Sequence, residues 1–124
     1  MEHLFVGVWA VEVHEPGKPR VERVTYACNA DGVVAIAAAT YAAHGVWVAT
    51  GERSGSVAAL LPVPQGEGFS GWLTMQATVE VAADGRTFEM DATAYRPTPS
   101  GATTQRPARL VAERLTIGGH QQRA

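Results

Sequence analysis

Apolar and polar residues alternate along most of this 124-residue chain, and this alternation limits its fold more than any other feature. A spacing of two residues places successive side chains on opposite faces of a β-strand. The alternation is clearest in residues 73–81 and 88–94, where apolar positions are separated by Thr, Gln, Glu and Asp. We find no apolar stripe with helical spacing that is longer than two turns. The pattern therefore predicts an all-β fold whose apolar positions face the interior.

Turn-forming residues divide the chain into eight expected strands. Asp31-Gly32 and Asp84-Gly85 are hairpin signals, because these residues tolerate the positive φ of tight turns. Segments rich in Pro and Gly separate other pairs of strands. The expected strands are residues 4–13, 20–28, 33–40, 44–50, 56–63, 72–81, 86–96 and 108–117.

Short connections without a crossover helix predict that these strands form an antiparallel, up-and-down meander. Closure of the meander into an eight-stranded β-barrel removes its edges, and an open two-layer sandwich is the alternative. Residues 1–117 are expected to form this single domain, and residues 118–124 a flexible tail.

Composition excludes several classes of function. The formal net charge is -2 and Lys and Arg form no run, so we expect no nucleic-acid partner. No apolar run reaches the roughly 18 residues of a membrane helix, and Met1 to Phe5 do not resemble a signal peptide. Cys28 is the single cysteine, so no intrachain disulfide forms. We therefore expect a cytoplasmic protein without a membrane partner.

The stretch from Gly7 to Val13 predicts how one end of the barrel is built. Gly7 and Trp9 lie on the same face of the first expected strand. A large indole beside a position without a side chain suits the narrow end of a closed barrel. We expect Trp9 to plug that end and Gly7 to make room for it.

This Gly-x-Trp, the eight-strand meander and Arg114 in the last strand resemble the lipocalin-like, or calycin, barrels. The resemblance implies that Trp9 packs at the closed end and that Arg114 lies across it. A guanidinium group over an indole gains cation–π and stacking energy. Gly45-x-Trp47, followed by Gly51, is similar to small bacterial lipocalin-like domains.

The expected interior contains a polar aromatic side chain, Tyr26, on the same face as Cys28. Its hydroxyl needs a partner, either a backbone group in a filled core or a ligand's carbonyl or hydroxyl. Met75 and Met90 face each other from neighbouring strands, as adaptable ligand contacts or as core filler. We expect a cavity that these three side chains line, at the end of the barrel away from Trp9.

Two further aromatic residues are expected at this ligand site. Trp47 is predicted to line it, and the Gly-rich loop of residues 65–71 is predicted to gate it with Phe69 as a lid. Small inward residues would leave part of the barrel interior unfilled. Those residues are Ala77, Ala92 and Ala94.

The histidines share no metal-ligand spacing, so no metal site is expected. They are His3, His14, His44 and His120. Nitrobindin barrels bind haem through a late histidine, but His120 follows the last expected strand, so no cofactor is expected. His3 and the outward pair Glu12 and His14 are expected to be solvated.

Three hypotheses follow. The first is that the barrel binds a small hydrophobic molecule in its cavity. The second is a small barrel enzyme, a cyclase or isomerase acting on a hydrophobic biosynthetic intermediate, with Tyr26 as the best catalytic candidate. The third is a structural protein with a filled barrel. The unbroken apolar run at residues 33–39 also predicts a homo-oligomer that forms through the outer face.

Overall fold

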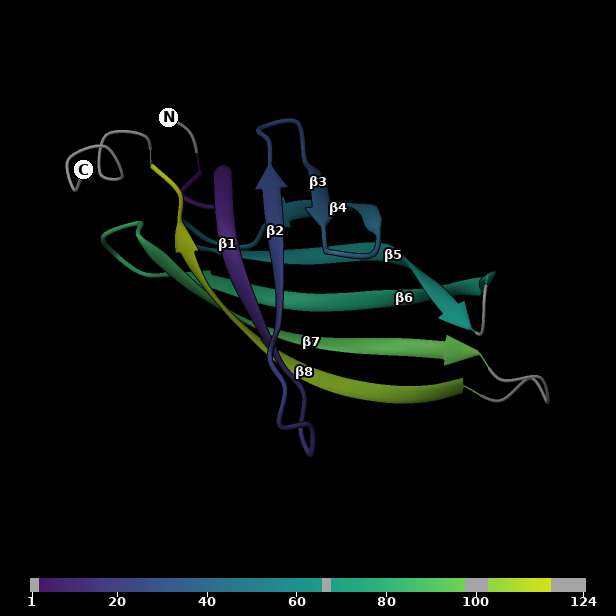
Figure 1. Cartoon of the computed structure of the whole chain (residues 1–124). Helices are drawn as coiled ribbons and strands as arrows, with labels where there is room; N and C mark the ends of the chain where they lie inside the picture. The colour runs from purple at the N-terminus through teal and green to yellow at the C-terminus, as the bar shows by residue number, and fades with distance from the viewer. Residues whose placement is uncertain (1–2, 66–67, 98–102, 117–124) are drawn as a thin grey trace.

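Eight antiparallel strands close into one barrel in the computed structural model of this chain (Figure 1). The structure describes residues 3–65, 68–97 and 103–116, with only the backbone described for 63–65, 68–70 and 97. The strands are β1 (Gly7–His14), β2 (Glu22–Cys28), β3 (Val33–Ala37), β4 (Ala42–Ala49), β5 (Ser54–Gln65), β6 (Gly68–Val81), β7 (Thr87–Pro97) and β8 (Thr103–Arg114).

Each strand pairs with its neighbour in sequence, and β1 also pairs with β8 to close the ring. The prediction of an all-β, up-and-down barrel is confirmed, and the two-layer alternative is wrong. No helix in the described ranges is long and apolar enough to cross a membrane.

The barrel is narrow at one end and splayed at the other. β5, β6, β7 and β8 have 12, 14, 11 and 12 residues, whereas β3 has five. In Figure 1 the far ends of β5 and β7 extend to the right, while the connection between β1 and β2 points down. These segments diverge, and the end of the barrel at which they do so is called its open end.

The interior follows the predicted alternation. In β2, Val24, Tyr26 and Cys28 are buried and the residues between them are exposed. In β6 and β7, Met75, Ala77, Val79, Val81, Phe88, Met90 and Ala92 are buried. Thr, Gln, Glu and Asp occupy outward positions of the same strands, because a charged or amide side chain without a partner is costly to bury. Strand parity alone was therefore sufficient to predict which face is inside.

The beginning of the barrel differs from the prediction of a strand at residues 4–13. Leu4 and Phe5 form a turn in which the Val6 N–H donates to the His3 carbonyl at 3.1 Å. The turn directs Phe5 into the barrel, where its side chain is 0% exposed. Residues before β1 thus cap the narrow end instead of extending the strand.

The predicted loop at residues 65–71 is also wrong. β5 continues to Gln65 and β6 begins at Gly68, with Pro64 paired to Phe69. The register shifts between Pro62 and Pro64, as expected because proline has no N–H to donate to a neighbouring strand. The predicted tail at residues 118–124 lies outside the described residues.

Candidate functional site

The closed end is organised around Trp9 and Arg114. The guanidinium carbon of Arg114 lies 4.2 Å from the centroid of the Trp9 ring, so the contact that the resemblance implies is present. The indole is 0% exposed, and its Nε1–H donates to the Phe5 carbonyl at 3.0 Å. Its ring also meets Phe88 edge-on at 4.9 Å. The indole therefore closes this end of the barrel.

Arg114 also joins two separate backbone segments through three carbonyls. Its Nε and Nη1 donate to the carbonyls of Gly85 and Val6, each at 2.7 Å, and Nη2 donates to the carbonyl of Leu4. Five N–H donors in a rigid plane suit this arrangement. The guanidinium therefore ties the segment before β1 to the connection between β6 and β7.

Gly7 makes room for the side chain of Arg114. The prediction that it makes room for the Trp9 indole is wrong. Its φ is +139°, a value that favours glycine. A Cβ built on Gly7 would overlap Nη1 of Arg114. Strand parity identified a crowded position correctly but could not identify the group that crowds it.

Trp47, predicted as a ligand contact, lies at this closed end and does not line the cavity at the opposite end. Its ring meets Phe5 edge-on at 5.2 Å, and its Nε1–H donates to the Asn29 carbonyl at 2.9 Å. A Cβ on Gly45 would overlap the Ala58 carbonyl, so this glycine allows β4 and β5 to approach closely. The second Gly-x-Trp therefore has a packing explanation.

His3, expected to be solvated, is half-buried and bonded. Its Nδ1 accepts from the Phe5 N–H at 3.0 Å, so Nε2 carries the hydrogen. Nε2–H donates to the carbonyls of Gly51 and Ser54, at 2.8 and 3.1 Å. The imidazole thus fixes the turn that contains Phe5.

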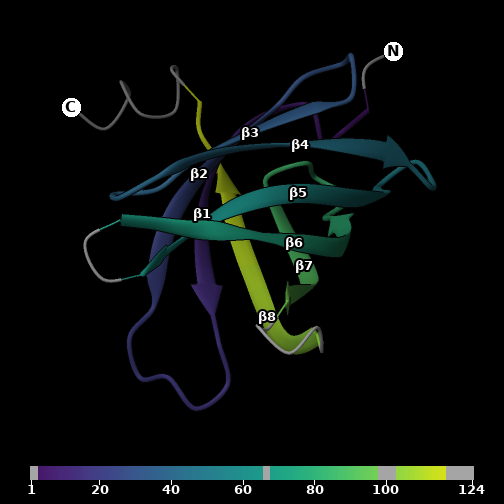
Figure 2. The ribbon, with the colours of Figure 1, turned by 90° about the vertical axis from the view of Figure 1, so that its right-hand side faces the viewer.

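A cavity of about 200 Å³ lies at the opposite, open end. Residues from the late part of β1, β5 and β7 and the early part of β2, β6 and β8 line it, which places it away from Trp9 as predicted. Figure 2 views the molecule from the side to which β5 and β7 extend. The lining consists of Val13, Glu15, Glu22, Val24, Tyr26, Ile36, Tyr41, Leu61, Leu73, Met75, Ala92, Ala94, Arg106, Ala108 and Leu110.

Tyr26 and Met75 both line this cavity. Tyr26 is 2% exposed, and its hydroxyl donates to the Met75 sulfur at 3.8 Å. Burial, with smaller contributions from Tyr41 and other neighbours, raises the pKa of Tyr26 above its ordinary value of 10.0. The phenol therefore remains protonated at neutral pH and acts as a hydrogen-bond donor.

Met90 is buried at 1% exposure but is not among the residues that line this cavity. It belongs to the packed core of the barrel. The side chain of Phe69 lies outside the described residues, so its predicted role as a lid stays a prediction. Of the five predicted ligand contacts, Tyr26 and Met75 meet at one cavity.

Charged side chains gather at the mouth of the cavity. Glu15 and Glu22 come from the connection between β1 and β2 and from the start of β2, and Arg106 comes from β8. Glu15 pairs with Lys18 at 2.8 Å. Burial raises the pKa of the half-buried Tyr41, and Glu22 and Glu15 raise it further. The cavity is thus apolar inside and polar at its entrance.

Tyr41 and Arg106 were not predicted to line a site. Tyr41 lies between the expected strands 33–40 and 44–50, and Arg106 lies between the expected strands 86–96 and 108–117. Arg106 has the same parity as Leu110 and Ala112, which are buried, but this signal is visible only when β8 is known to begin at Thr103.

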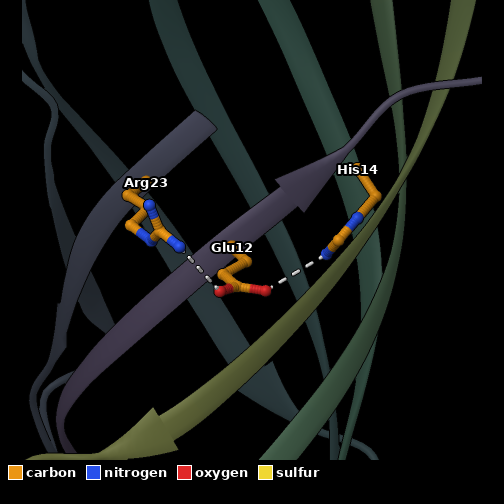
Figure 3. Close-up of polar contacts among 3 residues, drawn as sticks. All are labelled: Glu12, His14 and Arg23. Atoms are coloured by element: carbon orange, nitrogen blue, oxygen red, sulfur yellow. Dashed lines mark hydrogen bonds and ion pairs between the residues drawn. The ribbon is translucent and has the colours of Figure 1, made fainter. Parts of the chain in front are cut away.

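A second polar cluster lies on the outer wall (Figure 3). The Glu12 carboxylate lies 3.3 Å from His14 Nε2 and 3.5 Å from an Arg23 nitrogen. All three side chains are substantially exposed, and solvated ion pairs of this kind contribute little. The prediction that Glu12 and His14 point outward is confirmed.

A hollow of about 730 Å³ beside this cluster is larger than the interior cavity. Of its four charged residues, Arg23, Glu89 and Glu113 are exposed and Glu12 is half-buried, so it is an open depression that cannot exclude water. Within the described residues, no three His, Cys, Asp or Glu side chains are placed to hold a metal ion.

No protein-family model, curated protein or solved structure matches this chain. The geometry of the barrel and its cavity is therefore the basis for assigning a function.

Proposed function

We propose that this protein binds a small hydrophobic molecule in the cavity at the open end of its barrel. The observation that carries the proposal is the cavity itself, of about 200 Å³. Its inner wall is formed by buried side chains such as Val24, Ile36 and Leu110. Binding there would be driven by removal of apolar surface from water.

The volume of the cavity limits the size of the ligand. Drug-sized ligands occupy pockets of about 300–1,000 Å³, whereas an apolar cavity of roughly 150 Å³ holds benzene. The volume of this cavity lies between these two values. The ligand is therefore a molecule with a single ring or a short aliphatic chain.

Binding is a better explanation than catalysis by a cyclase or isomerase. Tyr26 is the catalytic candidate, but the raised pKa of its phenol makes it a weak acid at neutral pH. The other polar residues that line the cavity lie at its mouth. The site therefore favours orienting a ligand over transferring a proton to it.

Membership of the lipocalin-like, or calycin, barrels is part of this proposal. Two observations support it: the up-and-down order of eight strands, and the stacking of Arg114 on Trp9 at the closed end. In that case the two ends of the barrel have separate roles. One end is closed by packing, and the other admits the ligand.

Toluene is a suitable probe, because it has one ring and no polar group. We expect it to raise the melting temperature of the protein, since a ligand that binds only the native state stabilises it. Ala92→Leu would place extra volume in the cavity and abolish this shift. Ala58→Leu, on the exposed outer face of β5, is the matched control and should retain it.

Ligand-detected NMR of toluene provides an independent measurement of the same binding. Binding that is equal in the wild type and in Ala92→Leu would show that toluene binds elsewhere. Either that result or the absence of binding to the wild type would refute the proposal.

A further inference from the structure

One hydroxyl inside the cavity has only a weak acceptor. Tyr26 donates to the Met75 sulfur at 3.8 Å, and thioether sulfur is a poor acceptor compared with oxygen. A hydroxyl taken out of water without a good partner is destabilising. A ligand atom that accepts from Tyr26 more strongly than sulfur does would therefore be favoured.

Tyr26 is held in place by the barrel itself. It pairs with Trp9 on β1 and with Ile36 on β3, and its ring lies 6.3 Å from that of Phe88. Its hydroxyl is therefore aimed without further ordering. Met75 is unbranched and flexible, so its sulfur can move when a ligand enters.

The remaining lining determines the charge of the group that meets Tyr26. Glu15, Glu22 and Arg106 are at the mouth and are half-buried or exposed. Among the described lining residues, Tyr26 is the only fully buried side chain with a polar oxygen or nitrogen. A charged ligand group at that depth would have no counter-ion, which is costly.

The same lining distinguishes a carbonyl from a hydroxyl. A ligand hydroxyl brings its own donor, and the buried wall offers it only the Met75 sulfur or the Tyr26 oxygen. A carbonyl group has an acceptor and no donor, so the Tyr26 hydroxyl alone can satisfy its hydrogen bonding.

From these contacts we propose that the ligand is a small uncharged carbonyl compound, whose oxygen accepts the hydrogen bond that Tyr26 otherwise gives to Met75. This inference rests on the proposed binding function and specifies its ligand class. Ketones, aldehydes and esters with one ring or a short chain belong to this class.

Acetophenone and α-methylstyrene form a matched pair of probes, because they have almost the same shape and differ in C=O against C=CH₂. We expect Tyr26→Phe to weaken acetophenone binding by about three- to tenfold, the usual effect of one hydrogen bond. Binding of α-methylstyrene should not change. Dissociation constants from NMR titration of each protein provide the comparison.

Met75→Leu is the complementary variant, because it removes the sulfur acceptor and keeps a side chain of similar size. Acetophenone should bind more tightly to this variant by about twofold or more, since the ligand-free hydroxyl loses its partner. The affinity for α-methylstyrene should again stay the same.

The infrared carbonyl stretch of bound acetophenone tests the contact in the wild type itself. We expect it at lower frequency than in an apolar solvent, with the shift absent in Tyr26→Phe. An unshifted stretch, or equal effects of Tyr26→Phe on both probes, would overturn the carbonyl inference and leave the binding function standing. Absence of binding by both probes would overturn the binding function as well.

Discussion

Arg114 makes more contacts than its half-buried position suggests. It stacks on Trp9 and donates to three backbone carbonyls from two segments that are more than 70 residues apart in sequence. Charge-assisted hydrogen bonds of this kind are stronger than neutral ones. The side chain thus stabilises the closed end of the barrel, while the apolar cavity lies at the opposite end.

We predict that Arg114→Lys lowers the free energy of unfolding by about 1–3 kcal/mol, because one ammonium group cannot reproduce the planar set of donors. Arg109→Lys on the same strand is the control. Arg109 pairs with Glu89 and Asp91 on the exposed wall. Arg109→Lys should therefore lower the free energy of unfolding by less than about 1 kcal/mol. Urea unfolding measures both, and equal losses would contradict the role given to Arg114.

Cys28 predicts a dependence of stability on alkaline pH. Burial raises the pKa of its thiol from 9.0 to about 12. The unfolded chain therefore loses this proton first as the pH rises above 9, and the native state loses stability up to about pH 12. The slope from one such group is at most about 1.4 kcal/mol per pH unit.

We predict a shallower fall in stability above pH 9 for Cys28→Ala than for the wild type. Tyr26 and Tyr41 have raised pKa values too, so a residual fall should begin near pH 10. Denaturation at a series of pH values gives the slopes, and identical slopes for the two proteins would show that the thiol does not titrate in this way.

At the scale of elements, the turn before β1 acts as a plug. Phe5 packs between the rings of Trp9, Trp47 and Phe88 at 6.4, 5.2 and 5.5 Å. Offset and edge-to-face aromatic contacts add to the stabilisation from burial. The plug therefore connects β1, β4 and β7, which are not neighbours in the sheet.

Phe5→Ala should destabilise the protein by about 3–5 kcal/mol, the usual cost of deleting a fully buried aromatic side chain. Leu115→Ala is a suitable control, because Leu115 is 53% exposed just beyond β8. Thermal and urea unfolding should detect a large effect only for Phe5. A small effect for Phe5→Ala would mean that the turn does not contribute to closure.

At the scale of the whole molecule, the outer face of β3, β4 and β5 carries exposed apolar side chains. The outer apolar patch consists of Val33, Val46, Val48 and Leu60, which are 40, 58, 62 and 44% exposed. Val33 pairs directly with Val46 across the sheet. Soluble monomers rarely expose large contiguous apolar patches, so this patch is a candidate surface for the homo-oligomer, which stays a prediction.

We predict that two copies of this chain associate through the outer apolar patch. Val46→Lys should raise the dissociation constant at least about tenfold, because it buries an unpaired charge in the interface. Leu115→Lys changes a similarly exposed residue outside the patch and should leave association unchanged. Light scattering over a range of concentrations provides the test, and a wild type that remains monomeric throughout would refute the prediction.

The sequence by itself determined the number, the order and the faces of the strands, but not all of their ends. Alternation of apolar and polar residues is a local property, so it correctly predicted that Val24, Tyr26 and Cys28 lie inside. The Asp-Gly turns determined where hairpins occur. The Gly-x-Trp and Arg114 were sufficient to predict the stacking at the closed end, because a family resemblance supplied a contact that spacing could not.

Only the tertiary structure decided what meets inside the barrel. Gly7 and Arg114 adjoin because β1 and β8 pair when the ring closes, and no local pattern encodes the register of strands so distant in sequence. The same closure separated Trp47 from the cavity and placed Tyr26 beside Met75. Parity determines the face on which a side chain lies, whereas its height along the barrel depends on the stagger between all eight strands.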